Sequence, residues 1–184
     1  MARKPVEKTD YEKRVHSARW NFLFMCALTV INLGVLLFEG NEYYISSSSF
    51  AIYLMKLGKI YCGKMDNDFY VGKYANIEFL SGEFYFYMIA SSVVIAGIFL
   101  LLWWLSKKHY AFMIVGLVLI LADTIFMIFV YEFNFMTFCD YAIHIFMMVM
   151  IGLGVHASIK LKRIKADEEA FMASVRNTHR EMFR

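Results

Sequence analysis

Three ionisable residues lie in or beside long apolar stretches of this sequence, and their side chains could act together. Asp123 interrupts the segment ILADTIFMIF at residues 120–129, where Thr124 is the other polar residue. Asp140 and His144 are four residues apart, a spacing that puts two side chains on one face of a helix. Carboxylate and imidazole groups can share a proton, and both bind divalent metal ions. These residues therefore predict a site for a proton or an ion.

The composition indicates that the elements carrying these residues cross a membrane. Of 184 residues, 60% are hydrophobic and 18% are aromatic, and there is a single proline. A soluble domain is less apolar, and a helix needs about 20 residues to cross a bilayer. Apolar blocks of that length lie at residues 20–38, 84–105, 110–131 and 139–159. The sequence predicts an all-α integral membrane protein, a bundle of four transmembrane helices.

Residues 39–83, between the first two spans, are long enough to hold structure of their own. Serines occupy positions 46–49 and offer an N-cap, and apolar residues then recur at helical spacing. This pattern predicts a helix at about residues 46–62 that is too short to span and lies in the outer interface or dips into it. Two other placements remain open, a cap packed over the bundle and a re-entrant lid over a pore.

The distribution of Lys and Arg predicts the orientation. Residues 1–19 carry six, the link at 106–109 carries two and residues 160–184 carry seven, whereas residues 39–83 carry four. Under the positive-inside rule, both termini are cytoplasmic and residues 39–83 are extracytoplasmic. We expect the protein to lie in a bacterial cytoplasmic membrane.

The basic residues on the cytoplasmic side predict contacts with anionic lipid headgroups. They are Arg3, Lys4, Lys13, Arg14, Arg19, Lys107, Lys108, Lys160, Lys162 and Arg163. Aromatic platforms among these charges are missing from the terminal segments, which argues against nucleic-acid binding. Apolar residues recur as a rough heptad over residues 161–182, which indicates a cytoplasmic helix. That helix could bind a protein partner or a second copy, pack on the N-terminal helix, or lie on the membrane.

Polar residues from all four spans fall at similar depths if each span is helical. With a rise of about 1.5 Å per residue, Asp123 lies roughly 12 Å below the outer boundary and His144 roughly 7–8 Å below it. A charged acid at such a depth must face the bundle and find a partner, or stay protonated. The predicted polar layer consists of Asn32, Ser91, Ser92, Asp123, Thr124, Asp140 and His144.

This layer has several interpretations. It could bind or relay a proton or a small ion, as in a channel or transporter, or it could be a hydrogen-bonded network that joins helices. A metal site would use Asp123, Asp140 and His144 and could support a membrane-embedded hydrolase. The alternative function is a non-conducting sensor or anchor that presents its cytoplasmic helices to a protein partner. The sequence identifies no cofactor and no catalytic motif.

Cys62 and Cys139 both fall on the predicted outer side. They are a candidate disulfide if their Cα atoms come within about 7 Å of each other. The alternative is two unpaired, partly buried thiols.

Overall fold

The structure is a computed structural model that describes residues 5–38, 47–65, 67–71 and 76–182. Its regular secondary structure over these residues is helical: α1 (Pro5–Phe38), α2 (Ser49–Tyr61), the short 3-10 helix η1 (Asn67–Tyr70), α3 (Gly82–Leu105), α4 (Ala111–Val130) and α5 (Phe135–Met182). Four of them, α1, α3, α4 and α5, are long and apolar enough to cross a membrane. The predicted all-helical class with four helices of transmembrane length is confirmed.

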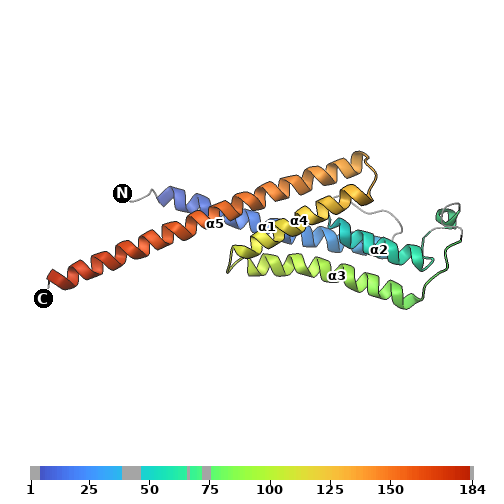
Figure 1. Cartoon of the computed structure of the whole chain (residues 1–184), viewed down its shortest axis with the longest axis horizontal. Coiled ribbons are helices and arrows are strands. Elements are labelled where there is room, and N and C mark those ends of the chain that lie inside the picture. Colours follow the sequence, from blue (N-terminus) through green and yellow to red (C-terminus); the bar gives the residue numbers. More distant parts are fainter. Residues whose placement is uncertain (1–4, 39–46, 66, 72–75, 183–184) are drawn as a thin grey trace.

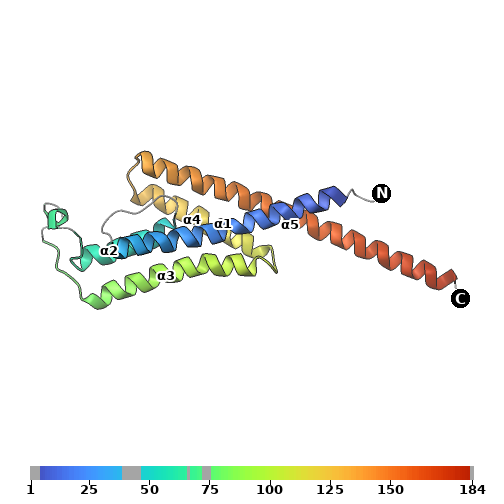
Figure 2. The same ribbon diagram turned by 180° about the vertical axis from the view of Figure 1, so that it is seen from behind.

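The four long helices lie side by side in an elongated bundle, as Figure 1 shows. Helix α1 begins and α5 ends at the same end of the bundle, which we call the terminal end; the opposite end, where α1 ends and α3 begins, is the loop end. The view from behind in Figure 2 shows α1 crossing α5 and running beside α3 toward the loop end.

Two of the long helices extend well beyond the apolar blocks seen in the sequence. Helix α1 starts at Pro5, where the missing N–H of proline is harmless because the first helical turn has no acceptor for it. Helix α5 runs through the fourth apolar block and the C-terminal segment as one helix of 48 residues. At a rise of about 1.5 Å per residue, it is roughly 70 Å long and exceeds the thickness of a bilayer.

The main core lies between α1, α3, α4 and α5 and is apolar. Phe22 and Met25 from α1, Met113 from α4 and Ile151 from α5 are all fully buried there. Glycine allows the closest approach between α1 and α5, since a Cβ at Gly154 would overlap the Cβ of Ala18. The helices are therefore in contact through small residues, as is common in membrane bundles.

Helix α2 occupies a place inside the bundle at the loop end. Its residues Ala51, Ile52 and Met55 are fully buried, and Ile52 and Met55 form a second core cluster with Leu33 and Leu36 of α1. Figure 1 shows α2 running along the bundle beside α3. The helix expected at residues 46–62 is thus present, but it packs between the long helices along the bundle, because one of its faces is apolar and needs partners.

Candidate functional site

The N-terminus of α2 lies deep between the long helices. The backbone N–H of Ser48 donates to Oγ1 of Thr29 at 2.9 Å. Thr29 stands nine residues before the end of α1, which is about 13 Å along the helix. From this point α2 runs back toward the loop end, so it is a half-helix whose N-terminus points into the bundle.

The carboxylate of Asp123 caps this buried N-terminus. Its Oδ1 accepts hydrogen bonds from the Ser48 hydroxyl at 3.1 Å and from the Phe50 N–H at 2.9 Å, and its Oδ2 accepts from the Ser49 N–H at 2.9 Å. The first N–H groups of a helix have no partner within the helix and carry a partial positive charge. A carboxylate satisfies both requirements. This explains why α4 carries an acid within an apolar segment.

The local capping expected from the serine run does not form. Ser48 stands at the N-cap position of α2, yet its hydroxyl donates to Asp123 and makes no capping bond to its own helix. The cap comes from a residue 75 positions away in the sequence. A carboxylate replaces the weaker hydroxyl cap because it carries a full charge.

His144 of α5 completes the site. Its side chain is fully buried, with Nδ1 at 2.8 Å from the Asp140 backbone oxygen and Nε2 at 3.2 Å from Oδ2 of Asp123. A carbonyl oxygen only accepts, so Nδ1 must carry a proton. The contact between Nε2 and Oδ2 then needs one further proton, on either atom, because two lone pairs would repel each other at that distance.

The groups around Asp123 influence whether this proton lies on Nε2 or on Oδ2. Three donors from α2 point at the carboxylate, and hydrogen bonds from neutral donors and a helix N-terminus stabilise the ionised form. With the shared proton on Nε2 the contact is an ion pair, and with the proton on Oδ2 both side chains are neutral. The side chains of His144 and Asp123 are only 0% and 6% exposed, so the pair is enclosed in the bundle.

Of the two predicted serines of α3, Ser92 contacts α2. The Ser92 hydroxyl lies 2.8 Å from the backbone oxygens of both Ala51 and Met88, so it links α3 to α2. Ser91 is only half-buried. The sequence placed both near the depth of Asp123, but the helix rotation turns Ser92 toward α2.

The other polar residues of the predicted layer lie in the same region with different partners. The Thr124 hydroxyl donates to the Ile120 backbone oxygen of its own helix at 2.7 Å. Asn32 is fully buried in α1, and Asp140 is 5% exposed. It is the backbone oxygen of Asp140 that contacts His144.

The proposed metal triad is not assembled in this structure. Within the described residues, no three His, Cys, Asp or Glu side chains cluster closely enough to hold a metal ion. Asp123 and His144 contact each other directly, and the ring nitrogen of His144 that faces Asp140 is bonded to a backbone oxygen. Both imidazole nitrogens are thereby occupied.

The three cysteines of the chain, Cys26, Cys62 and Cys139, are free thiols in the structure. The Cys62 Sγ donates to the Ser81 backbone oxygen at 3.3 Å, in the loop-end connection that leads into α3. The considered disulfide between Cys62 and Cys139 is not formed in this structure.

Lys59 was missed by the sequence analysis. Its position off the apolar stripe of α2 gave no sign of burial, yet the residue is only 5% exposed. Its Nζ donates to the backbone oxygen of Leu36 at 3.1 Å. Leu36 lies in the last turn of α1, where carbonyl groups lack partners and carry partial negative charge. No local pattern could reveal this contact, because it joins two helices.

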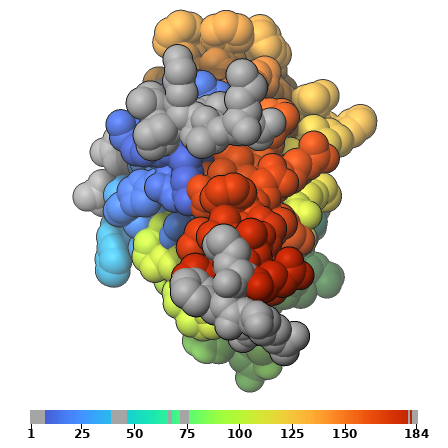
Figure 3. Space-filling model, turned by 90° about the vertical axis from the view of Figure 1, so that its left-hand side faces the viewer, coloured from blue at the N-terminus to red at the C-terminus, as the bar shows by residue number. Residues whose placement is uncertain are grey.

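Basic and aromatic residues meet at the terminal end. The Lys107 Nζ lies over the Trp103 ring at 4.0 Å from its centroid, and Lys108 lies over Trp104 at 5.4 Å. Such cation–π contacts are typical of side chains at a membrane interface. Figure 3 looks onto the terminal end and shows the start of α1 beside the projecting end of α5.

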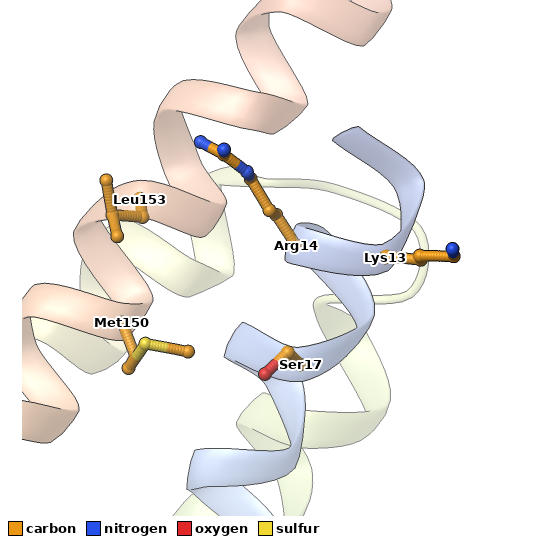
Figure 4. Close-up of a pocket in the computed structure, with 5 residues that line it drawn as sticks. All are labelled: Lys13, Arg14, Ser17, Met150 and Leu153. Atoms are coloured by element: carbon orange, nitrogen blue, oxygen red, sulfur yellow. The ribbon is translucent and has the colours of Figure 1, made fainter. Parts of the chain in front are cut away.

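A groove of about 330 Å³ lies between α1 and α5 near the terminal end. It is lined by Lys13, Arg14, Ser17, Met150 and Leu153. Figure 4 shows Arg14 reaching toward α5, while Lys13 points away from it.

The remaining basic residues predicted to bind headgroups have different surroundings. Lys162 and Arg163 are exposed, whereas Lys160 and Arg19 are half-buried. Arg3 and Lys4 lie outside the described residues. Burial of the Arg19 side chain reflects its position one residue before the apolar block of α1.

Comparisons with protein-family models, with curated proteins and with solved structures found no match. The function must therefore be inferred from the geometry of the site.

Proposed function

We propose that this chain is an integral membrane protein that binds a proton at the Asp123–His144 pair and relays it, as a channel or transporter does. The buried contact between Nε2 of His144 and Oδ2 of Asp123, at 3.2 Å, carries this proposal. Ionisable residues inside membrane bundles are costly and are typical of proton pathways. The charge distribution supports an orientation with the terminal end in the cytoplasm and the loop end outside.

The hydrogen bonds of the pair suit the binding of a proton better than the binding of a larger ion. The contact requires one proton between Nε2 and Oδ2, and this proton can reside on either atom while the two atoms stay in contact. Transfer converts imidazolium and carboxylate into neutral imidazole and carboxylic acid, so charge and atoms balance. Both carboxylate oxygens already accept hydrogen bonds from α2, which leaves little room for a bound cation.

Proton flux in reconstituted vesicles tests the proposal. Purified protein in liposomes that contain a pH-sensitive dye is exposed to a pH step, and the rate of internal pH change is measured. We expect faster equilibration than in protein-free vesicles, and loss of this gain in Asp123→Asn and His144→Gln. Glu132→Gln, which neutralises an exposed carboxylate, should keep the wild-type rate. If Asp123→Asn conducts as well as the wild type, the pair is a structural link between helices and the proposal is wrong.

A second function is favoured by the end of α5. Residues 165–179 are exposed, including Phe171 at 65%, Met172 at 63% and Val175 at 49%. The ion pair between Lys8 and Glu168, with Nζ and Oε2 at 2.7 Å, lies where the start of α1 still accompanies α5. We propose as the alternative that the protein is a non-conducting sensor or anchor and presents this helix to a cytoplasmic protein partner.

Photocrosslinking separates the outcomes for this helix. A photoreactive amino acid at Phe171 should give a discrete adduct with another protein, identified by mass spectrometry. The photoreactive amino acid placed instead at exposed Glu169 shows which molecules lie near a neighbouring face of the helix. An adduct with a second copy of this chain would indicate a homo-oligomer, and an adduct with lipid alone would contradict the partner proposal.

A further inference from the structure

We infer that α2 is a proton-controlled gate: the charge on Asp123 holds its N-terminal half, and its C-terminal end is a fixed hinge. Neutralisation of Asp123 releases the N-terminal half and opens the pair toward the loop end. This inference rests on the proposed binding of a proton at the same pair and assigns the moving element that such binding controls.

The hold on the N-terminal half depends on charge. Ser48, Ser49 and Phe50 donate three hydrogen bonds to the Asp123 carboxylate. A protonated carboxyl group turns one acceptor oxygen into a donor, and it loses the charge that interacts with the helix N-terminus. The proton can come from Nε2 of His144, which becomes neutral, or from water. In both cases the donors of α2 lose a strong acceptor.

The other polar contacts of this half are single hydrogen bonds between neutral groups, while the side chains of Ala51 and Ile52 are buried in the bundle. Thr29 of α1 accepts from the Ser48 N–H, the Tyr131 hydroxyl donates to the Ser49 backbone oxygen at 3.2 Å, and Ser92 of α3 contacts the Ala51 backbone oxygen. Phe50 is 42% exposed, and its ring meets that of Phe126 edge-on with 5.1 Å between the centroids. A neutral hydrogen bond contributes about half as much as a charge-assisted one.

The C-terminal end of α2 is held independently of Asp123. Lys59 donates to Leu36 of α1, and the Leu80 N–H donates to the Tyr61 backbone oxygen at 2.7 Å. Gly58 packs so closely on α3 that an added Cβ would lie 2.9 Å from the Met88 Cβ. This end has the properties of a hinge, because its contacts persist when Asp123 changes its charge.

The helices that pack around Asp123 bring different ionisable and polar groups toward it. On α5, His144 faces the carboxylate and Asp140 lies one turn away. On α2, Lys59 is charged and contacts Leu36, but it lies ten residues beyond Ser49, at the hinge end. The faces of α1 and α3 present the hydroxyls of Thr29 and Ser92. The charge that holds α2 is therefore that of Asp123: α2 is held while this carboxylate is ionised, and the hold weakens when the carboxylate binds a proton.

Release would expose the pair in one direction. The first turn of α2 lies directly on the carboxylate, between it and the rest of the half-helix that leads to the loop end. Movement of this turn would let water reach Asp123 from the loop end. The apolar core of Phe22, Met25 and Ile120 lies toward the terminal end and would stay closed.

Amide hydrogen exchange of the full-length protein in liposomes tests the inference. We expect exchange at residues 49–53 to be about tenfold or more faster in Asp123→Asn than in the wild type, because a charge-assisted anchor is lost. Residues 55–61 should exchange as in the wild type, and so should both segments in Glu132→Gln. Lowering the pH on the wild-type protein should produce the same local change after correction for intrinsic exchange rates. This pH series keeps the test decisive if Asp123→Asn does not fold.

The opposite results would overturn the gate. Equal exchange in wild type and Asp123→Asn would show that the charge does not hold α2, and equal acceleration over all of residues 49–61 would exclude a hinge. These readouts do not need proton flux. If protons flow but the exchange of α2 does not respond to the charge of Asp123, the gate alone is refuted. If the exchange of α2 responds but no protons flow, the relay alone is refuted.

A crosslink across the gate provides a second test. Ser49 and Met127 touch, with Oγ and Sδ at 3.3 Å, so cysteines at these positions can be joined by a short thiol crosslinker in a background without native cysteines. We expect this crosslink to abolish proton flux. A crosslink at the hinge, between cysteines at Tyr61 and Phe84, whose rings lie 6.2 Å apart, should leave flux unchanged. Full flux with the Ser49–Met127 crosslink closed would contradict the gate.

Discussion

The carboxylate of Asp123 joins three helices, because it belongs to α4, accepts hydrogen bonds from α2 and contacts His144 of α5. Burial of a single charge in a bundle costs several kcal/mol unless partners replace water. Here the two oxygens accept three hydrogen bonds from α2, and one of them also contacts the imidazole. The acid is thus tolerated because its neighbours supply the interactions that water would have supplied.

At this scale, we predict energetic coupling between Asp123 and His144. In a double-mutant cycle with Asp123→Asn and His144→Gln, the unfolding free energies in detergent should show a coupling of about 0.5–3 kcal/mol, as for residues in direct contact. The matched control pairs Asp123→Asn with Ser106→Ala, since Ser106 follows α3 at the terminal end and donates to Trp103. That pair should be additive. Additive effects for Asp123 and His144 would mean that the observed contact contributes nothing.

A charged side chain takes part in a contact at each end of α2. Asp123 of α4 caps its N-terminus, and its own Lys59 donates to the last turn of α1. Each charge has the sign that suits the helix end it meets, negative at an N-terminus and positive at a C-terminus. These two contacts position a short helix that would be only marginally stable by itself.

Removal of the positive charge should loosen the end of α1. We expect Lys59→Met to accelerate amide exchange around residues 35–38 and to lower the unfolding free energy by about 1 kcal/mol, the upper range for a charge at a helix terminus. Lys56→Met, on the same helix, keeps the Leu36 contact and should leave this segment unchanged. Unaltered exchange in Lys59→Met would show that other groups satisfy the last turn of α1.

Two glycines of α5 should respond differently to alanine. At Gly154 a Cβ would overlap Ala18 and the end of Met113, so Gly154→Ala should separate α1 from α5 and destabilise the protein by about 1–3 kcal/mol. At Gly152 a Cβ meets nothing within 4 Å, so Gly152→Ala should stabilise the helix by up to about 1 kcal/mol. Thermal melting in detergent measures both. Equal melting temperatures would refute a tight crossing.

Over the whole molecule, the beginning of α1 and the end of α5 lie together, and the loop end holds α2 and η1 at the other extreme. An even number of long helices, joined end to end, brings the chain back to the end of the bundle where it began, which agrees with this arrangement. The excess of basic residues at the terminal end favours the cytoplasm for that side.

Cysteine labelling in intact cells tests this orientation. In a background without native cysteines, an impermeant maleimide should label Asp68→Cys, in η1 at the loop end, before lysis. Ser174→Cys, on the exposed end of α5, should be labelled only after lysis. The reverse pattern would invert the predicted orientation, and labelling of both before lysis would contradict an odd number of membrane crossings between residues 68 and 174.

The sequence by itself determined the helical class, the four long apolar helices and the need of Asp123 for partners. These properties follow from hydrophobicity, segment length and the cost of a buried charge, each of which is set locally by residue type. Depth arithmetic also placed His144 within reach of Asp123, and the structure brings them into contact.

Only the tertiary structure decided what the acid contacts. The sequence placed Asp123 in a layer with side chains of the four long helices, His144 among them, and did not include α2, whose N-terminus Asp123 caps at Ser49. The sequence also gave no indication that Lys59 is buried, with its Nζ on the backbone oxygen of Leu36. Both contacts depend on where α2 enters the bundle. That position follows from packing against α1, α3 and α4 at once, and a one-dimensional pattern carries no information on such a fit.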